Sequence, residues 1–148
     1  MKKILLVIVL VLIGIQFITI DKTNPPVDMT KDFIAITNPP TDLGIVIKSA
    51  CYDCHSNNTK YPWYSDVAPV SWLIKEHIDN GRNHLNFSIW PDYKENKKAG
   101  KIDECLDMIR SGEMPMKGYV MLHEEAEITH EKKMQLISWL TELQDSLK

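Results

Sequence analysis

The chain has 148 residues, of which 44% are hydrophobic and 25% are charged, as is ordinary for one globular domain. Its formal net charge is −3, and −5 beyond residue 20, because Lys2 and Lys3 are the only charged residues before that point. This balance argues against nucleic acid as a partner, since phosphate binding needs clustered positive charge. Three cysteines are too few for a disulfide scaffold.

The first segment, residues 1–20, reads as a signal anchor. After two lysines, Ile4 to Ile20 contains no charged residue, and seventeen helical residues reach about 25 Å, at the short end of what crosses a bilayer core of ~30 Å. No small-residue cleavage site stands near its end. We therefore expect an N-terminal membrane-anchor helix, a cytoplasmic N-terminus and the remainder in the periplasm, at the inner membrane.

Residues 21–41 predict an extended, proline-rich tether, because Asn24-Pro25-Pro26 and Asn38-Pro39-Pro40 bracket them and disfavour helix. Residues 42–148 then form the predicted domain. Apolar residues recur there at helical spacing, and no run alternates with period two, so we expect an all-α fold. The expected helices run from Thr41 or Asp42 to Ala50, from Asp66 to a stop at Gly81, over 102–111, and from a cap at Thr129 to about 147.

The sequence Cys51-Tyr52-Asp53-Cys54-His55 is typical of c-type haem attachment. Two cysteines at this spacing can each form a thioether bond with a haem vinyl group, and the histidine that follows can bind the iron. We expect one covalently attached haem per chain, held by Cys51, Cys54 and His55. Such attachment takes place outside the cytoplasm, in agreement with the expected anchor.

Three other interpretations of the cysteine pair remain. A redox pair usually follows a strand, and none precedes Cys51. A zinc site needs two more ligands at similar spacing, but Cys105 stands alone and is read as a buried packing thiol. A disulfide across two residues is strained. Covalent haem attachment explains the five-residue pattern best.

The sixth iron ligand is open on the residues alone. Met114, before Pro115, is a suitable axial ligand, but Met116 and Met121 lie in the same loop and His77 is a further candidate on a half-buried helical face. Arg82 is expected to pair with a haem propionate, because a guanidinium binds carboxylates with two parallel hydrogen bonds.

The order of these features resembles the small bacterial haem-binding domain family of cytochrome-c-like proteins. The resemblance rests on the Asn-Pro-Pro segment, Cys51–His55, Tyr61-Pro62-Trp63-Tyr64, Gly81-Arg82, Gly112-Glu113-Met114-Pro115 and the final helix with Trp139, and it covers residues 20–145. The chain is also similar to class I cytochromes c, in which a Met-Pro loop supplies the distal ligand. This resemblance implies a cytochrome-c-like helical domain with His55 and Met114 as the iron ligands.

These features predict a membrane-tethered electron carrier, not an enzyme, that exchanges single electrons with redox partner proteins. The alternative is a haem-based sensor or peroxidase-like module, which needs an open distal site and an acid–base group such as His77, His84 or His123. A haem-free module with a Cys51–Cys54 disulfide is the third possibility.

Overall fold

The computed structural model describes all of residues 1–148, and every regular element in it is helical. The α-helices and 3-10 helices (η) are α1 (Lys2–Ile15), η1 (Met29–Lys31), α2 (Phe33–Thr37), α3 (Thr41–His55), η2 (Trp63–Asp66), α4 (Val70–His84), η3 (Phe87–Asp92), α5 (Glu95–Ser111), α6 (Lys117–Val120), η4 (Glu124–Ala126) and α7 (His130–Ser146). The helical part of the predicted fold class therefore agrees with the structure.

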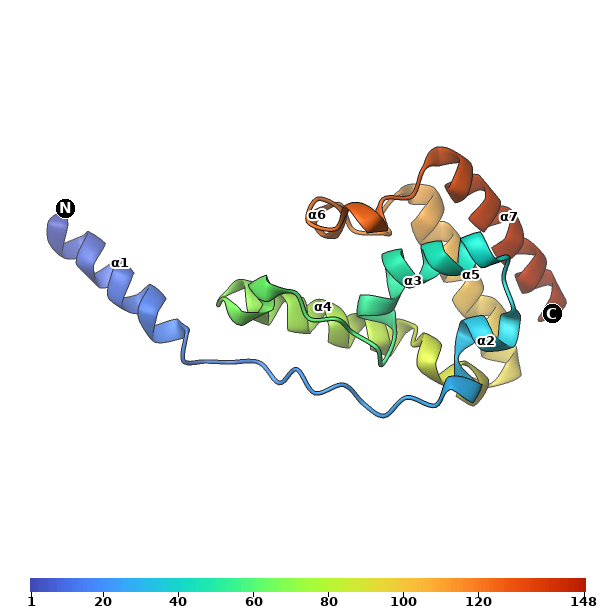
Figure 1. Cartoon of the computed structure of the whole chain (residues 1–148), viewed down its shortest axis with the longest axis horizontal. Helices are drawn as coiled ribbons and strands as arrows, with labels where there is room; N and C mark the ends of the chain where they lie inside the picture. Colours follow the sequence, from blue (N-terminus) through green and yellow to red (C-terminus); the bar gives the residue numbers. More distant parts are fainter.

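The predicted membrane-anchor helix is wrong. Helix α1 ends at Ile15, so its 14 residues span only about 21 Å. No helix in the chain combines the length and the apolar character needed to cross a bilayer. Figure 1 shows α1 standing apart from the other helices, and none of its residues is buried. Just after the end of α1, the side-chain amide of Gln16 exchanges two hydrogen bonds of 3.0 Å with the backbone of Ala68.

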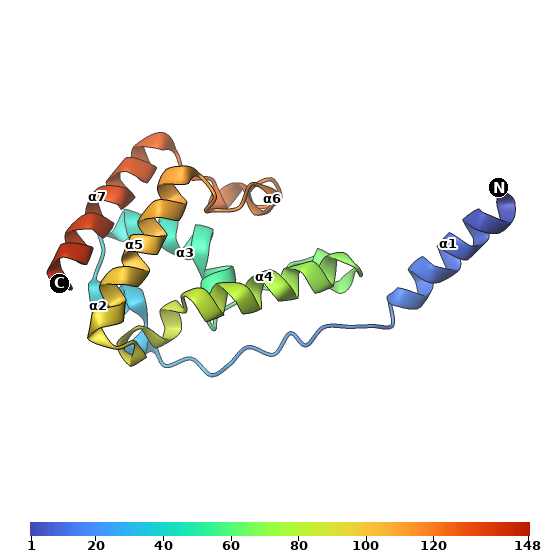
Figure 2. The same ribbon diagram turned by 180° about the vertical axis from the view of Figure 1, so that it is seen from behind.

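The core lies where α3, α5 and α7 meet. Helix α5 packs along α7, and α3 contacts both α7 and α4 (Figures 1 and 2). The buried apolar cluster consists of Phe33, Leu43, Ile47, Tyr52, Leu85, Phe87, Trp90, Ile102, Leu106, Ile109, Leu136 and Leu140. Burying these side chains is the main stabilising contribution, at about 1.5–3 kcal/mol for each large aliphatic or aromatic group. The cluster reaches the last turn of α3 through Tyr52. The core therefore directly supports residues 51–55, which are called the haem motif below.

The second half of the predicted tether, residues 21–41, is anchored in the domain. Phe33, which is 1% exposed, packs in the core with its ring centroid 4.9 Å from those of Phe87 and Trp90. Asp32 begins α2 by accepting hydrogen bonds from the backbone N–H groups of Ile34 and Ala35. The folded unit therefore starts near residue 29, earlier than the boundary at residue 42 that the prolines indicated.

An extended N-terminal strap, residues 16–28, links α1 to this unit. Besides the Gln16 contacts, the indole N–H of Trp72 donates to the carbonyl of Ile18 at 2.9 Å, and Lys22 forms an ion pair with Asp66. Prolines keep the strap extended, as expected, but its polar groups bind the domain. The end of the expected anchor and the first residues of the expected tether are therefore held against η2 and α4.

Four predicted helix ends differ from the structure. Helix α3 continues past Ala50 to His55, and α4 begins at Val70, four residues after the expected start at Asp66. Helix α4 runs through Gly81 and ends at His84, and α5 begins at Glu95, seven residues before the expected start at Ile102. Gly81 ends no helix because its conformation is helical and its missing side chain serves a packing contact, described below. The predicted cap at Thr129 is confirmed, since its hydroxyl accepts a hydrogen bond from the N–H of Lys132.

Candidate functional site

The last turn of α3 carries the three residues predicted to hold haem. Cys51, Cys54 and His55 follow one another within the final five residues of the helix. All three cysteines of the chain are free thiols. At 100° per residue, positions 51, 54 and 55 lie on one side of the helix. The structure therefore presents both sulfur atoms and the imidazole from a single turn.

His55 is oriented by the backbone that follows α4. Its Nδ1 atom lies 3.0 Å from the carbonyl oxygen of Leu85, so Nδ1 carries the proton and donates it. Burial lowers the pKa of His55, which keeps the ring neutral at pH 7. Nε2 then has its lone pair available for a metal. This is the arrangement in which proteins fix a metal-binding histidine, with the second nitrogen bonded to a carbonyl.

Helix α4 crosses α3 at Gly81, directly against the haem motif. A Cβ atom at this position would meet the carbonyl oxygen of Cys54 at 2.6 Å, a distance that real Cβ atoms do not adopt. Glycine is therefore required for the close approach of the two helices. This crossing brings Leu85, four residues later, within reach of His55. His77 and His84 lie one turn to either side of Gly81 on the same side of α4.

Burial controls the chemistry of the three thiols. It raises the pKa of Cys51 to about 12, with smaller contributions from Cys105 and Cys54 nearby, and raises the pKa of Cys54 to about 11. The pKa of Cys105, read as a packing thiol, is also raised by burial, to about 12, and its side chain packs against the core. Redox-active cysteine pairs need a lowered pKa, so these thiols are unsuited to that role.

Arg82 binds the chain segment that follows His55. Its Nε donates to the carbonyl of Ser56 at 2.8 Å, and one Nη donates to Thr59 Oγ1 at 2.8 Å and to Asn24 Oδ1 at 2.7 Å. The Asn24 amide also donates to the carbonyl of Thr59 at 2.8 Å. Arg82 therefore fastens the N-terminal strap to the turn after the haem motif. The pairing of Arg82 with a haem propionate stays a prediction. The second Nη, which these three bonds do not use, is the donor for that pairing.

The predicted distal ligand Met114 lies in the loop between α5 and α6. Gly112, with φ 76°, ends α5 in the left-handed conformation, and the N–H of Met114 then donates to the carbonyl of Met108 at 3.1 Å. Met114 and Met116 are both half-buried, whereas Met121 is 78% exposed. The high exposure of Met121 makes it the weakest candidate for the iron ligand. The choice of Met114 over Met116 stays a prediction.

The three histidines proposed as acid–base groups differ in their surroundings. His123 has partners on both ring nitrogens, with Nε2 2.6 Å from the hydroxyl of Tyr64 and Nδ1 3.2 Å from Glu125 Oε1. It also stacks on Tyr119, with ring centroids 4.3 Å apart. His84 is exposed and His77 is half-buried. His123 is thus held in a structural cluster, which disfavours a distal catalytic role for it.

The residues present fit a covalently bound haem better than the alternatives do. No three or more His, Cys, Asp and Glu side chains gather in a set that could hold a metal ion, which leaves a zinc site without support. Haem attachment needs two free thiols and one neutral imidazole whose Nε2 is not bonded elsewhere, and the last turn of α3 supplies these.

Residues 10–142 match a family model described as a haem-binding domain. The chain belongs to this haem-binding domain family. The match begins inside α1 and ends inside α7, so it includes the strap, the haem motif and the methionine loop. No match was found among curated proteins or among solved structures. Family membership therefore establishes haem as the ligand.

Sequence reasoning missed several residues of the site. Asn24 was interpreted only as part of a tether, yet it bonds to Arg82 and to the carbonyl of Thr59 in the segment after the haem motif. No role was predicted for Tyr119, which bonds to Asp53 within the motif. No role was predicted for Asp53, which lies between the two cysteines and accepts the hydrogen bond from Tyr119. The sequence indicated their partners only weakly, because a polar residue beside prolines or inside a motif often binds only water or its own backbone.

Proposed function

We propose that this haem-binding domain is a c-type cytochrome that transfers single electrons between redox partner proteins outside the cytoplasm, in the periplasm. Cys51 and Cys54 attach one haem covalently, and His55 and Met114 are its axial ligands. A bound haem supplies one-electron exchange at its iron. The chain contributes attachment, axial ligation and a helical environment of low dielectric constant. No acid–base chemistry is assigned to it, so it acts as a carrier and not as an enzyme.

One observation supports this proposal above all others. The Nδ1 atom of His55 is engaged by Leu85 while both thiols of the motif are free on the same helical turn. A histidine with only a structural role in the core would need neither a free Nε2 nor two free thiols on the same helical turn. Methionine as the second ligand raises the reduction potential, which suits an electron carrier in an oxidising compartment.

Two measurements test the proposal. Protein made together with the haem-attachment machinery is expected to retain haem on a denaturing gel, and the Cys51→Ala/Cys54→Ala variant is expected to lose it. Cys105→Ser is the matched control and should retain the haem stain. The oxidised protein should show a methionine–iron charge-transfer band, and the reduced protein should not respond to CO. A high-spin spectrum with rapid CO or peroxide binding would instead establish a sensor or peroxidase-like module.

A further inference from the structure

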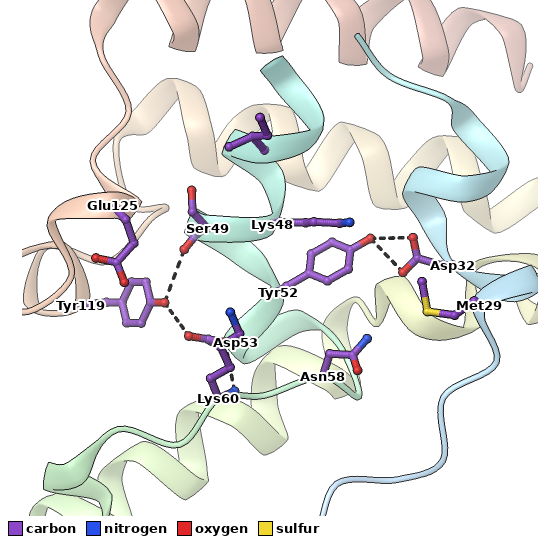
Figure 3. A pocket seen from close by; sticks show the side chains of 11 residues that line it. Met29, Asp32, Lys48, Ser49, Tyr52, Asp53, Asn58, Lys60, Tyr119 and Glu125 are labelled. Atoms are coloured by element: carbon purple, nitrogen blue, oxygen red, sulfur yellow. Dashed lines mark hydrogen bonds between the residues drawn. The ribbon is translucent and has the colours of Figure 1, made fainter. Parts of the chain in front are cut away.

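The two residues between the cysteines of the haem motif bind different parts of the chain. Tyr52 donates its hydroxyl to both carboxylate oxygens of Asp32 at 3.1 Å, on the N-terminal side of the domain. Asp53 accepts a hydrogen bond from the hydroxyl of Tyr119 at 2.8 Å, on the side of α6. Figure 3 shows the two tyrosines at opposite ends of a cavity of about 430 Å³. Cys51, Cys54 and His55 do not line it, so these contacts lie on another side of α3.

Asp53 is a junction between the haem motif and two loops. Its Oδ1 accepts from the N–H of Lys60 at 3.1 Å, and its backbone carbonyl accepts from Thr59 Oγ1 at 2.6 Å. Its Oδ2 is bound by Tyr119, whose pKa is raised by burial and by this carboxylate. The phenol therefore keeps its proton and remains the donor of the bond.

The bond to Tyr119 fastens the segment that carries the methionine candidates. Residues 112–126 connect α5 to η4, and their only regular structure before η4 is the single turn of α6. Beyond Tyr119, the segment is held by the bond between His123 and Tyr64 and by Ala126, which is fully buried. Of these three attachments, the Tyr119 bond is nearest to Met114 in sequence and the only one made to the haem motif itself.

We propose that the Asp53–Tyr119 hydrogen bond positions the methionine loop, so that the haem motif holds its own distal ligand in place. The inference rests on the proposed function, because it presumes that Met114 binds the iron. An irregular loop loses conformational entropy when one side chain must stay at a metal, and a bond that orders the loop in advance reduces that loss. Asp53 and Tyr119 are positioning residues and do not touch the haem.

The test compares Tyr119→Phe with Tyr52→Phe. Each variant removes the hydroxyl group of one tyrosine. The Tyr119 hydroxyl bonds to Asp53, whereas the Tyr52 hydroxyl bonds to Asp32. Only Tyr119→Phe therefore releases the methionine loop. In the haem-loaded protein, Tyr119→Phe is expected to weaken the methionine–iron band and to speed CO association about tenfold, the factor expected for one lost hydrogen bond. Tyr52→Phe should leave both unchanged. Asp53→Ala should resemble Tyr119→Phe, and the double variant should be no worse than Asp53→Ala.

A second readout does not depend on the ligand. Hydrogen exchange of the α6 amides, whose N–H groups bond to Met116 and Lys117, should accelerate about tenfold in Tyr119→Phe and not in Tyr52→Phe. If the α6 amides of Tyr119→Phe exchange at the wild-type rate, the proposed positioning role is wrong. If the wild-type protein shows no methionine band, the proposed ligation fails, and exchange in α6 alone decides whether Asp53 holds this loop.

Discussion

A Cβ atom at Gly81 would lie 2.6 Å from the carbonyl oxygen of Cys54, so helix α4 touches the backbone of the haem motif where it has no side chain. This contact explains how a carbonyl at Leu85 comes to lie 3.0 Å from His55. Helix α4 could not approach α3 so closely if position 81 carried a side chain. The orientation of the proximal histidine thus depends on a glycine 26 residues away in sequence.

Gly81→Ala is expected to destabilise the protein by about 2 kcal/mol, because overpacking against a backbone atom outweighs the better helix propensity of alanine. Haem occupancy should fall as well, since α4 must move away from His55. Urea unfolding and the ratio of haem to protein absorbance measure the two effects. Gly100→Ala in α5 is the matched control, because a Cβ there meets nothing within 4 Å. It should stabilise by about 0.5–1 kcal/mol. Equal effects at both positions would contradict the close contact.

Met114→Ala is expected to open the sixth position of the iron, so that the reduced protein binds CO and the oxidised protein loses its methionine–iron band. Met116→Ala, two residues away in the same loop, should change neither property. CO titration of both reduced variants and of the wild type makes the comparison. CO binding in Met116→Ala alone would transfer the ligand assignment to that residue.

Arg82→Ala should destabilise the protein by about 2–3 kcal/mol, because three hydrogen bonds from a charged donor are lost, including the one to the buried carbonyl of Ser56. Asn24→Ala should cost about 1 kcal/mol, and the double variant less than the sum, since the two side chains share one network. Chemical denaturation measures these values.

Lys22→Ala provides the control for the strap. It removes an ion pair with Asp66, whose side chain is 72% exposed, and a 6.0 Å contact of the ammonium group with the Tyr61 ring, so it should cost only about 0.5 kcal/mol. If Asn24→Ala costs no more than Lys22→Ala, the strap does not brace the turn after the haem motif.

Thiol alkylation of the haem-free chain should depend steeply on pH. The pKa of Cys54 is about 11, compared with 9.0 for an ordinary thiol, so at pH 8 about one Cys54 side chain in a thousand is a thiolate. The rate with iodoacetamide should rise about tenfold per pH unit up to about pH 11. Because the folded chain retains the Cys54 proton, the contribution of this thiol to stability is fully present below pH 9 and decreases as the pH rises through about 11. A rate that levels off near pH 9 would show that the thiols are exposed.

The haem-binding family, the helical class and the cap at Thr129 could be predicted from the sequence alone. These features depend on a few adjacent residues, so local spacing is sufficient to read them. The spacing of apolar residues in the sequence does not show where a long apolar helix ends. The run predicted to span a membrane ends as a helix at Ile15, and the Gln16 side chain that follows bonds to Ala68, a residue distant in sequence.

Only the tertiary structure decided how the motif is supported. The carbonyl that orients His55, the glycine that admits α4, the clasp of Arg82 with Asn24, and the bond from Asp53 to Tyr119 all join residues more than 20 positions apart. Each is a hydrogen bond or a steric fit that exists only after the chain has folded. Local patterns identify side chains that can bind haem, whereas packing between distant helices fixes their protonation, orientation and neighbours.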